Sequence, residues 1–135
     1  MEVDELTERI IGCAFRVHNE LGSGFLEKVY ENALALELTE SGLLVQQQPP
    51  VPVFYRGRMV GDYVADLIVE GRVVVEVKAV KSVAAEHEVQ LVNYLNATGI
   101  QDGLLINFGT SVQVNRKFGR TCAGRFTPRP PKPNA

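Results

Sequence analysis

The sequence predicts a single α/β domain in which a mixed β-sheet is flanked by α-helices. Its 135 residues are 45% hydrophobic, which is enough apolar material for one buried core. Two amphipathic segments open the chain, and short β-branched runs separated by turn residues follow them. A further helical segment lies between two of these runs, which favours a parallel β-α-β crossover. The expected order of elements is therefore α-α-β-β-β-β-α-β-β.

Three segments carry the apolar spacing of amphipathic helices. The first two are expected over residues 3–21 and 25–41, where apolar residues recur three and four positions apart. Glycines follow each of them, as is usual where a helix ends. The third helix is expected over residues 84–98 and is followed by Gly99.

The β-branched runs predict strands on both sides of the third helix. The expected strand segments are 44–48, 51–55, 59–60, two within 63–78, then 103–108 and 112–118. The sequence Arg56-Gly57-Arg58 predicts a hairpin turn, and its two arginines are either a solvated loop tip or a phosphate contact. The alternating pattern of the last segment is typical of an edge strand.

Within the most apolar stretch of the chain, residues 63–78, three charged residues stand at positions where a strand should be apolar. They are Asp66, Glu76 and Lys78, and the last two are two positions apart, so on a strand they share a face. Charges among valines are costly to bury unless they are paired or bind something. One interpretation is an internal ion pair or a half-exposed edge strand. The other is a hydrolytic metal site, in which two carboxylates hold a hard cation such as Mg²⁺ and the lysine orients water or offsets phosphate charge.

The metal-site interpretation sets a condition on the turn between the two strands. A two-residue turn at Glu70-Gly71 would place Asp66 opposite Val75, with Glu76 on the other face. A three-residue loop with Gly71 in the left-handed conformation shifts the register by one residue and brings Asp66 and Glu76 onto one face. The hypothesis therefore requires a three-residue loop.

This set of residues resembles the core motif of the PD-(D/E)xK nucleases, an Asp followed about ten residues later by Glu-x-Lys. Ala65 replaces the proline that usually precedes the Asp. By this resemblance Asp66 and Glu76 are expected to bind the metal, helped by the carbonyl of Val77, with Lys78 acting in catalysis.

Two further motifs extend the resemblance. Residues 24–30 read GFLEKVY, which fits G-x-x-E-x-x-Y and is similar to the GxxExxY proteins, a family grouped with the same nucleases. The position of Glu27 in the first turn of a helix indicates a partner of the helix dipole. The resemblance implies instead that Glu27 is a third acidic metal ligand. Gln90-x-x-x-Tyr94 resembles an element of RecB-like nucleases that lies beside the active site, which implies that both residues support catalysis.

Charge and composition limit the possible partners and location. The net charge is −2, from 14 basic and 16 acidic residues, which does not favour a nucleic-acid partner but does not exclude one, because a metal site itself contributes acids. Cys13 and Cys122 have no metal-ligand spacing and are expected to be thiols in a reducing compartment. With no signal segment or apolar span, a soluble cytoplasmic protein without membrane contact is expected.

Taken as a whole, the sequence predicts a nuclease-like domain over residues 1–126 and a mobile, proline-rich tail over residues 127–135. The expected function is a phosphodiesterase that uses Mg²⁺ or Mn²⁺ and acts on nucleic acid, with DNA as the favoured substrate. A homodimer or a partner protein is expected to supply specificity. Two alternatives stay open: a catalytically silent binding or regulatory module of the same fold, and a purely structural ion-paired core.

Overall fold

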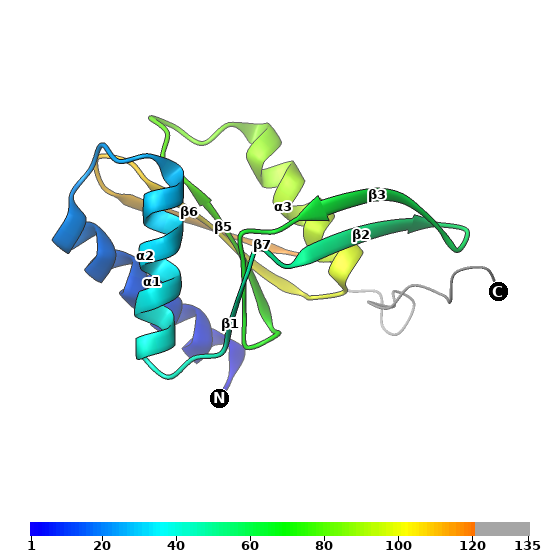
Figure 1. Cartoon of the computed structure of the whole chain (residues 1–135), viewed down its shortest axis with the longest axis horizontal. Coiled ribbons are helices and arrows are strands. Elements are labelled where there is room, and N and C mark those ends of the chain that lie inside the picture. Colours follow the sequence, from blue (N-terminus) through cyan, green and yellow to red (C-terminus); the bar gives the residue numbers. More distant parts are fainter. Residues whose placement is uncertain (121–135) are drawn as a thin grey trace.

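The computed structural model describes residues 1–120, which contain three helices and seven strands (Figure 1). In chain order these are α1 (Val3–Leu21), α2 (Glu27–Glu40), β1 (Val45–Gln47), β2 (Pro50–Tyr55), β3 (Arg58–Val64), β4 (Leu67–Val69), β5 (Val73–Lys78), α3 (Ala85–Thr98), β6 (Asp102–Phe108) and β7 (Val112–Phe118). The predicted domain boundary at residue 126, the predicted tail and Cys122 lie outside the described residues. No described helix is long and apolar enough to cross a membrane.

The mixed sheet flanked by helices is confirmed. Five strands pair in the order β1-β4-β5-β6-β7, with β5 and β6 parallel and every other pair antiparallel. The helix α3 makes the predicted crossover between β5 and β6, and β7 is an edge strand as expected. Side chains of β5 alternate between two cores. Val73 and Val75 pack in the core that contains α1 and α2, whereas Val74 packs in the core that contains α3.

Five strands separate α2 from α3, which agrees with the five expected strand segments but not with the expected order of elements, which counted four. Residues 63 and 64 were assigned to the same strand as Asp66, but they end β3, and the chain changes direction at residues 65 and 66 before β4 begins. The separation has a physical cause: among residues 1–120, β3 pairs only with β2, and these two strands form a second sheet that does not join the main one.

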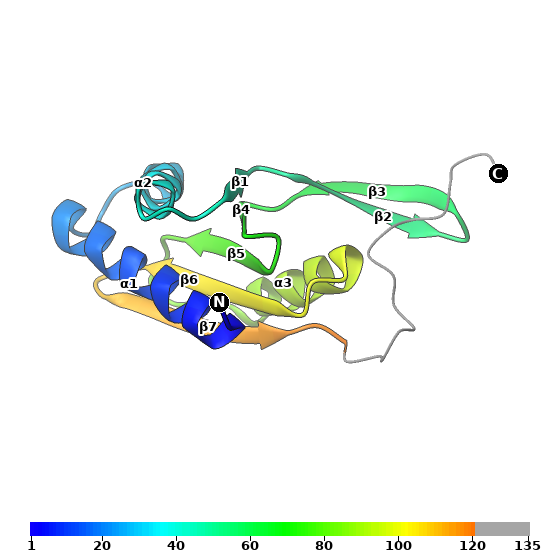
Figure 2. The ribbon, with the colours of Figure 1, turned by 90° about the horizontal axis from the view of Figure 1, so that it is seen from below.

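The two-stranded sheet is an arm that projects from the domain, and we call residues 50–64 the β2–β3 arm. The arm and the α1–α2 pair lie at opposite ends of the long axis of the molecule (Figures 1 and 2). Almost every residue of β3 is exposed, and a bulge interrupts the pairing after Val53. A two-stranded sheet is marginally stable alone, so the contact of β2 with α3 supports this arm at its base.

The turn between β4 and β5 has the length that the metal-site hypothesis requires. Val69 pairs with Val73, which leaves a loop of three residues, 70–72. Glu70 and Gly71 both have positive φ, 55° and 64°, and the N–H of Arg72 donates to the carbonyl of Val69 at 3.0 Å. Extending this register by one residue places position 66 opposite position 76, as predicted.

The aromatic ring of Tyr30 holds the loop between α1 and α2. Tyr30 is fully buried and stacks on Phe108 with ring centroids 4.7 Å apart. Its hydroxyl donates to the carbonyl of Gly22 at 2.7 Å and accepts from the N–H of Phe25 at 3.2 Å. Nearby, His18 Nε2 lies 2.9 Å from the carbonyl oxygen of Gly109. The tyrosine of the G-x-x-E-x-x-Y motif therefore fixes where α2 begins.

We predict that Tyr30→Phe lowers the free energy of unfolding by about 1–3 kcal/mol, because it removes two hydrogen bonds that the hydroxyl makes to partly buried backbone groups. Urea denaturation followed by circular dichroism measures this change. Tyr55→Phe is the matched control, since the same hydroxyl is removed from a side chain that is 58% exposed. Equal stability of the two variants would contradict the bracing role of Tyr30.

Candidate functional site

Asp66 and Glu76 lie across from each other and are joined through the backbone. The N–H of Asp66 donates to Glu76 Oε2 at 2.9 Å, and the N–H of Val77 donates to Asp66 Oδ2 at 2.8 Å. Each carboxylate thus uses one oxygen to accept a backbone hydrogen bond and keeps the other for a different partner. The two acids that the sequence singled out are brought together.

Burial makes this pair costly to ionise. Glu76 is only 5% exposed, and Asp66 is half-buried. Loss of hydration, together with the negative charge of Asp66, raises the pKa of Glu76 to about 8. Burial likewise raises the pKa of Asp66 to about 6, against the lowering effect of its hydrogen bond from Val77. Such shifts are typical of functional sites, because a fold without a use for the charges gains nothing from burying them.

Lys78 follows Glu76 on the same face of β5. It is half-buried, and its positive charge lowers the pKa of both carboxyl groups, opposing the effect of burial. The segment after it is fixed by Asn107, a fully buried residue of β6. Asn107 Oδ1 accepts from the N–H of Val80 and its Nδ2 donates to the carbonyl of Val80, both at 2.9 Å. These two hydrogen bonds hold the backbone at Val80, two residues after Lys78, against β6.

Gln90 and Tyr94, the two residues predicted to support catalysis, lie one turn apart on α3. Gln90 Nε2 donates to the hydroxyl oxygen of Tyr94 at 3.1 Å. Burial raises the pKa of Tyr94, and the charges of Glu76 and Asp66 raise it further, so this hydroxyl lies within the field of the pair. The Tyr94 ring also lies beside that of Tyr63 on the arm, with centroids 6.1 Å apart.

Glu27 begins α2 and acts on the pair from the other side. It is half-buried, and its negative charge raises the pKa of both Asp66 and Glu76. Within the described residues, however, no three His, Cys, Asp or Glu side chains are close enough together to hold a metal ion. The assignment of Glu27 as a third ligand therefore stays a prediction.

A second glutamate of α2, which the sequence analysis missed, also belongs to this site. Glu31 is 2% exposed, and its carboxylate accepts from Gln47, Gln48 and Lys28 at 2.8–3.3 Å. Gln48 connects it to Asp66, because its N–H donates to the Asp66 carbonyl at 2.8 Å. The sequence feature that indicates this residue is its position on α2: it is an acid one turn after Glu27, on the side of the helix that faces the core.

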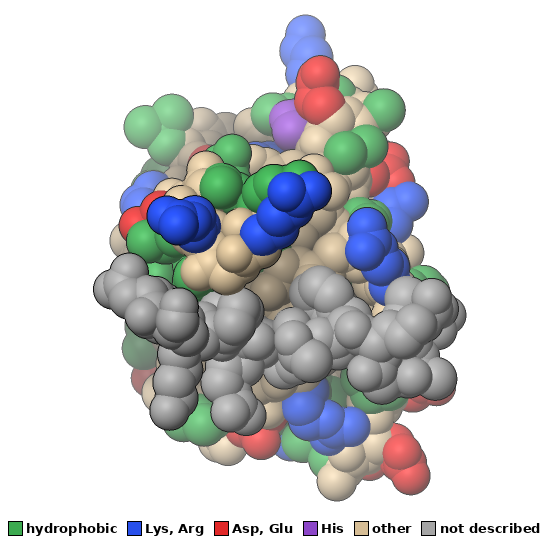
Figure 3. Space-filling model, turned by 90° about the vertical axis from the view of Figure 1, so that its right-hand side faces the viewer, with side chains coloured by type: hydrophobic (Ala, Val, Ile, Leu, Met, Phe, Trp, Pro, Cys, Tyr) green, Lys and Arg blue, Asp and Glu red, His purple; other side chains and the backbone are tan. Residues whose placement is uncertain are grey.

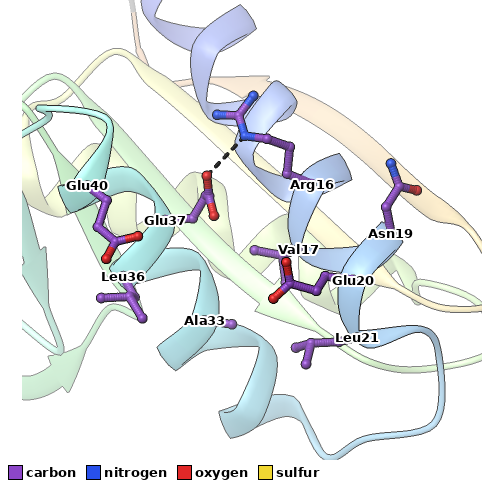
Figure 4. Close-up of a pocket in the computed structure, with 9 residues that line it drawn as sticks. All are labelled: Arg16, Val17, Asn19, Glu20, Leu21, Ala33, Leu36, Glu37 and Glu40. Atoms are coloured by element: carbon purple, nitrogen blue, oxygen red, sulfur yellow. Dashed lines mark hydrogen bonds and ion pairs between the residues drawn. The ribbon is translucent and has the colours of Figure 1, made fainter.

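A groove between α1 and α2 is a separate feature of the surface (Figure 4). Leu21, Ala33 and Leu36 contribute its apolar part. Its polar lining is mostly acidic, with Glu20, Glu37 and Glu40, and Arg16 forms an ion pair with Glu37 at 3.0 Å. None of the predicted site residues lines this groove, and its acids would repel a phosphate.

Comparisons with known proteins agree with this fold. The model of the PD-(D/E)XK nuclease superfamily matches residues 4–120. Among solved structures, SSO0001 is similar with a TM-score of 0.55 and 17% identity, over 69% of this chain and 50% of that one. An alkaline exonuclease from Laribacter hongkongensis is similar with a TM-score of 0.48 and 12% identity, over 79% and 76% of the two chains. No curated protein matches the sequence.

These identities are low, and this chain spans about half the length of SSO0001, so that similarity shows the fold alone. The family model is stronger evidence, because it covers the three helices and the whole five-stranded sheet, including both strands of the Asp66–Glu76 pair. The chain therefore belongs to the PD-(D/E)XK nuclease superfamily.

Proposed function

We propose that this protein is a phosphodiesterase that depends on a divalent metal and cleaves nucleic acid, with DNA as the favoured substrate. The observation that carries the proposal is the buried pair Asp66–Glu76, with Lys78 on the same face. Family membership supports a nuclease-like function. The finer assignment to the GxxExxY group, carried by residues 24–30, and the cytoplasmic location are parts of this proposal.

The donor set fits a hard cation such as Mg²⁺ or Mn²⁺. Asp66 and Glu76 each keep one oxygen free of backbone hydrogen bonds, and two neighbouring carboxylates, one buried and one half-buried, gain from a positive charge between them. In a strand the N–H and C=O of one residue point the same way, so the carbonyl of Val77 faces Asp66 as its N–H does. When bound there, the cation would polarise the phosphodiester and acidify a water.

The remaining side chains have supporting roles in this proposal. Lys78 offsets the negative charge that develops on the phosphate, since it lies close enough to act on both carboxyl groups. Tyr94 and Gln90 present a hydrogen-bonded pair of polar groups on the α3 side of the site. Glu27, on the α2 side, adds negative charge that favours a cation.

A catalytically silent binding module is the second candidate. The observation in its favour is that no three potential ligand side chains meet within residues 1–120. The proposal of catalysis is tested by incubating the protein with single-stranded and duplex DNA and with RNA in Mg²⁺ or Mn²⁺. Cleavage that is lost in Asp66→Asn supports the enzyme. Metal binding without cleavage of any substrate would favour the silent module.

The raised pKa values predict how stability depends on pH without metal. Asp66 and Glu76 hold their protons more tightly when folded, with pKa values of about 6 and about 8 against ordinary values of 3.8 and 4.5. The free energy of unfolding should therefore fall as pH rises from about 4 to about 8. Urea denaturation in EDTA across this range measures the fall.

The variant Glu76→Gln should flatten the upper part of this pH dependence and raise the free energy of unfolding at pH 7, because the folded protein holds a proton on Glu76 that the unfolded chain has already lost, whereas glutamine is neutral in both states. It should also abolish the rise in Tm caused by Mg²⁺ or Mn²⁺ at pH 8. Glu8→Gln, an exposed change on α1, is the control and should alter neither property. A large loss of stability in Glu76→Gln at pH 7 would support a structural ion pair instead.

Lys78→Arg separates a catalytic lysine from a charge that only balances its neighbours. Arginine keeps the positive charge, but its planar guanidinium cannot take the place of a compact ammonium. We expect metal affinity and Tm to be nearly unchanged and the cleavage rate to fall about 10²-fold or more. A cleavage rate close to that of the unchanged protein would show that Lys78 acts through charge alone.

A further inference from the structure

One face of the β2–β3 arm continues from the candidate site. Val51 pairs with Tyr63 across the arm, and Val51 packs in the α3 core with Tyr94. Because residues two apart on a strand share a face, Tyr55 lies on the same face as Val51, and so does its cross-strand partner Arg58. This face, which we call the α3-side face, runs about 15 Å from Tyr63 to Arg58.

The ring of Tyr63 lies over a glycine. A Cβ added to Gly61 would come within 3.0 Å of a ring carbon of Tyr63. Gly61 shares the α3-side face, so the ring extends along the arm, and the absence of a side chain at position 61 makes room for it. Tyr63 nevertheless stays 53% exposed. A flat, exposed aromatic ring next to Tyr94 is a surface on which a planar group can stack.

The far end of the same face carries positive charge and a second aromatic ring. The guanidinium of Arg56 lies over the Tyr55 ring, 4.9 Å from its centroid, and Tyr55 is 58% exposed. Arg58, on the same face, is also exposed. Figure 3 views the end of the molecule toward which the arm projects. Lys and Arg side chains gather on this end, and acidic side chains lie toward its margins.

We propose that the α3-side face of the arm binds an unpaired strand of nucleic acid and leads it to the Asp66–Glu76 pair. A base stacks on Tyr63, and Arg56 and Arg58 bind backbone phosphates. The strand has to be unpaired because the bases of a duplex already stack on one another and cannot offer a free face to a tyrosine. This inference rests on the proposed function and adds the substrate class.

The test is fluorescence anisotropy with a labelled 20-nucleotide single strand, and with its duplex, in EDTA so that cleavage does not interfere. Tyr63→Leu keeps bulk but removes the π face, and should weaken binding of the single strand about tenfold or more. Tyr63→Phe keeps the ring and should bind within about twofold of the unchanged protein. Arg58→Gln should weaken binding and lower its salt dependence. Arg16→Gln, an exposed arginine on α1, is the control and should have no effect.

The outcomes separate the two proposals. Three outcomes would overturn the arm assignment while the nuclease proposal stands. They are cleavage of duplex alone, binding of the duplex as tightly as the single strand, and single-strand binding that Tyr63→Leu and Arg58→Gln leave unchanged. Single-strand binding that depends on Tyr63, without cleavage in any metal, would support the arm and overturn the enzyme. No nucleic-acid binding would overturn the arm assignment, and dimers seen by light scattering would then favour a second copy of the chain as the partner of the arm, with its exposed Met59 and Val64.

Discussion

The site depends on one constraint, the register that sets two carboxylates side by side at the end of a β-ladder. Glu76 accepts from the N–H of Asp66 at 2.9 Å and Asp66 accepts from the N–H of Val77 at 2.8 Å, so neither side chain can turn away without leaving a backbone donor unpaired. That geometry follows from three loop residues between β4 and β5. A loop shorter by one residue would send Glu76 into the opposite core.

Much of this could be predicted from the sequence, because local patterns determine it. The bounds of α1 and the end of α3 follow from apolar spacing and from the glycines at positions 22 and 99, which have φ of 76° and 77°. Gly71 indicated the loop that sets the register. Asp66, Glu76 and Lys78 could be identified as site residues because charges within an apolar strand are costly to bury unless they are paired or bind a ligand.

What escaped prediction depends on contacts between distant segments. Glu31 becomes part of the site only because Gln48, 17 residues away, reaches both Glu31 and Asp66. Asn107 supports the segment after Lys78 through Val80, 27 residues earlier. The boundary between β3 and β4 could not be placed from β-branched residues either, because both segments have strand composition and only the pairing partner differs.

The net charge of −2 does not describe the field that a substrate would meet. The first 40 residues contain nine acidic and three basic residues, whereas residues 41–135 contain seven acidic and eleven basic ones. The acidic helices α1 and α2 lie at the opposite end of the long axis from the arm (Figures 1 and 2). Because salt screens charges beyond about 8 Å at physiological ionic strength, the helical end has little effect on a strand held at the arm. A nearly neutral composition is therefore compatible with local attraction for phosphates.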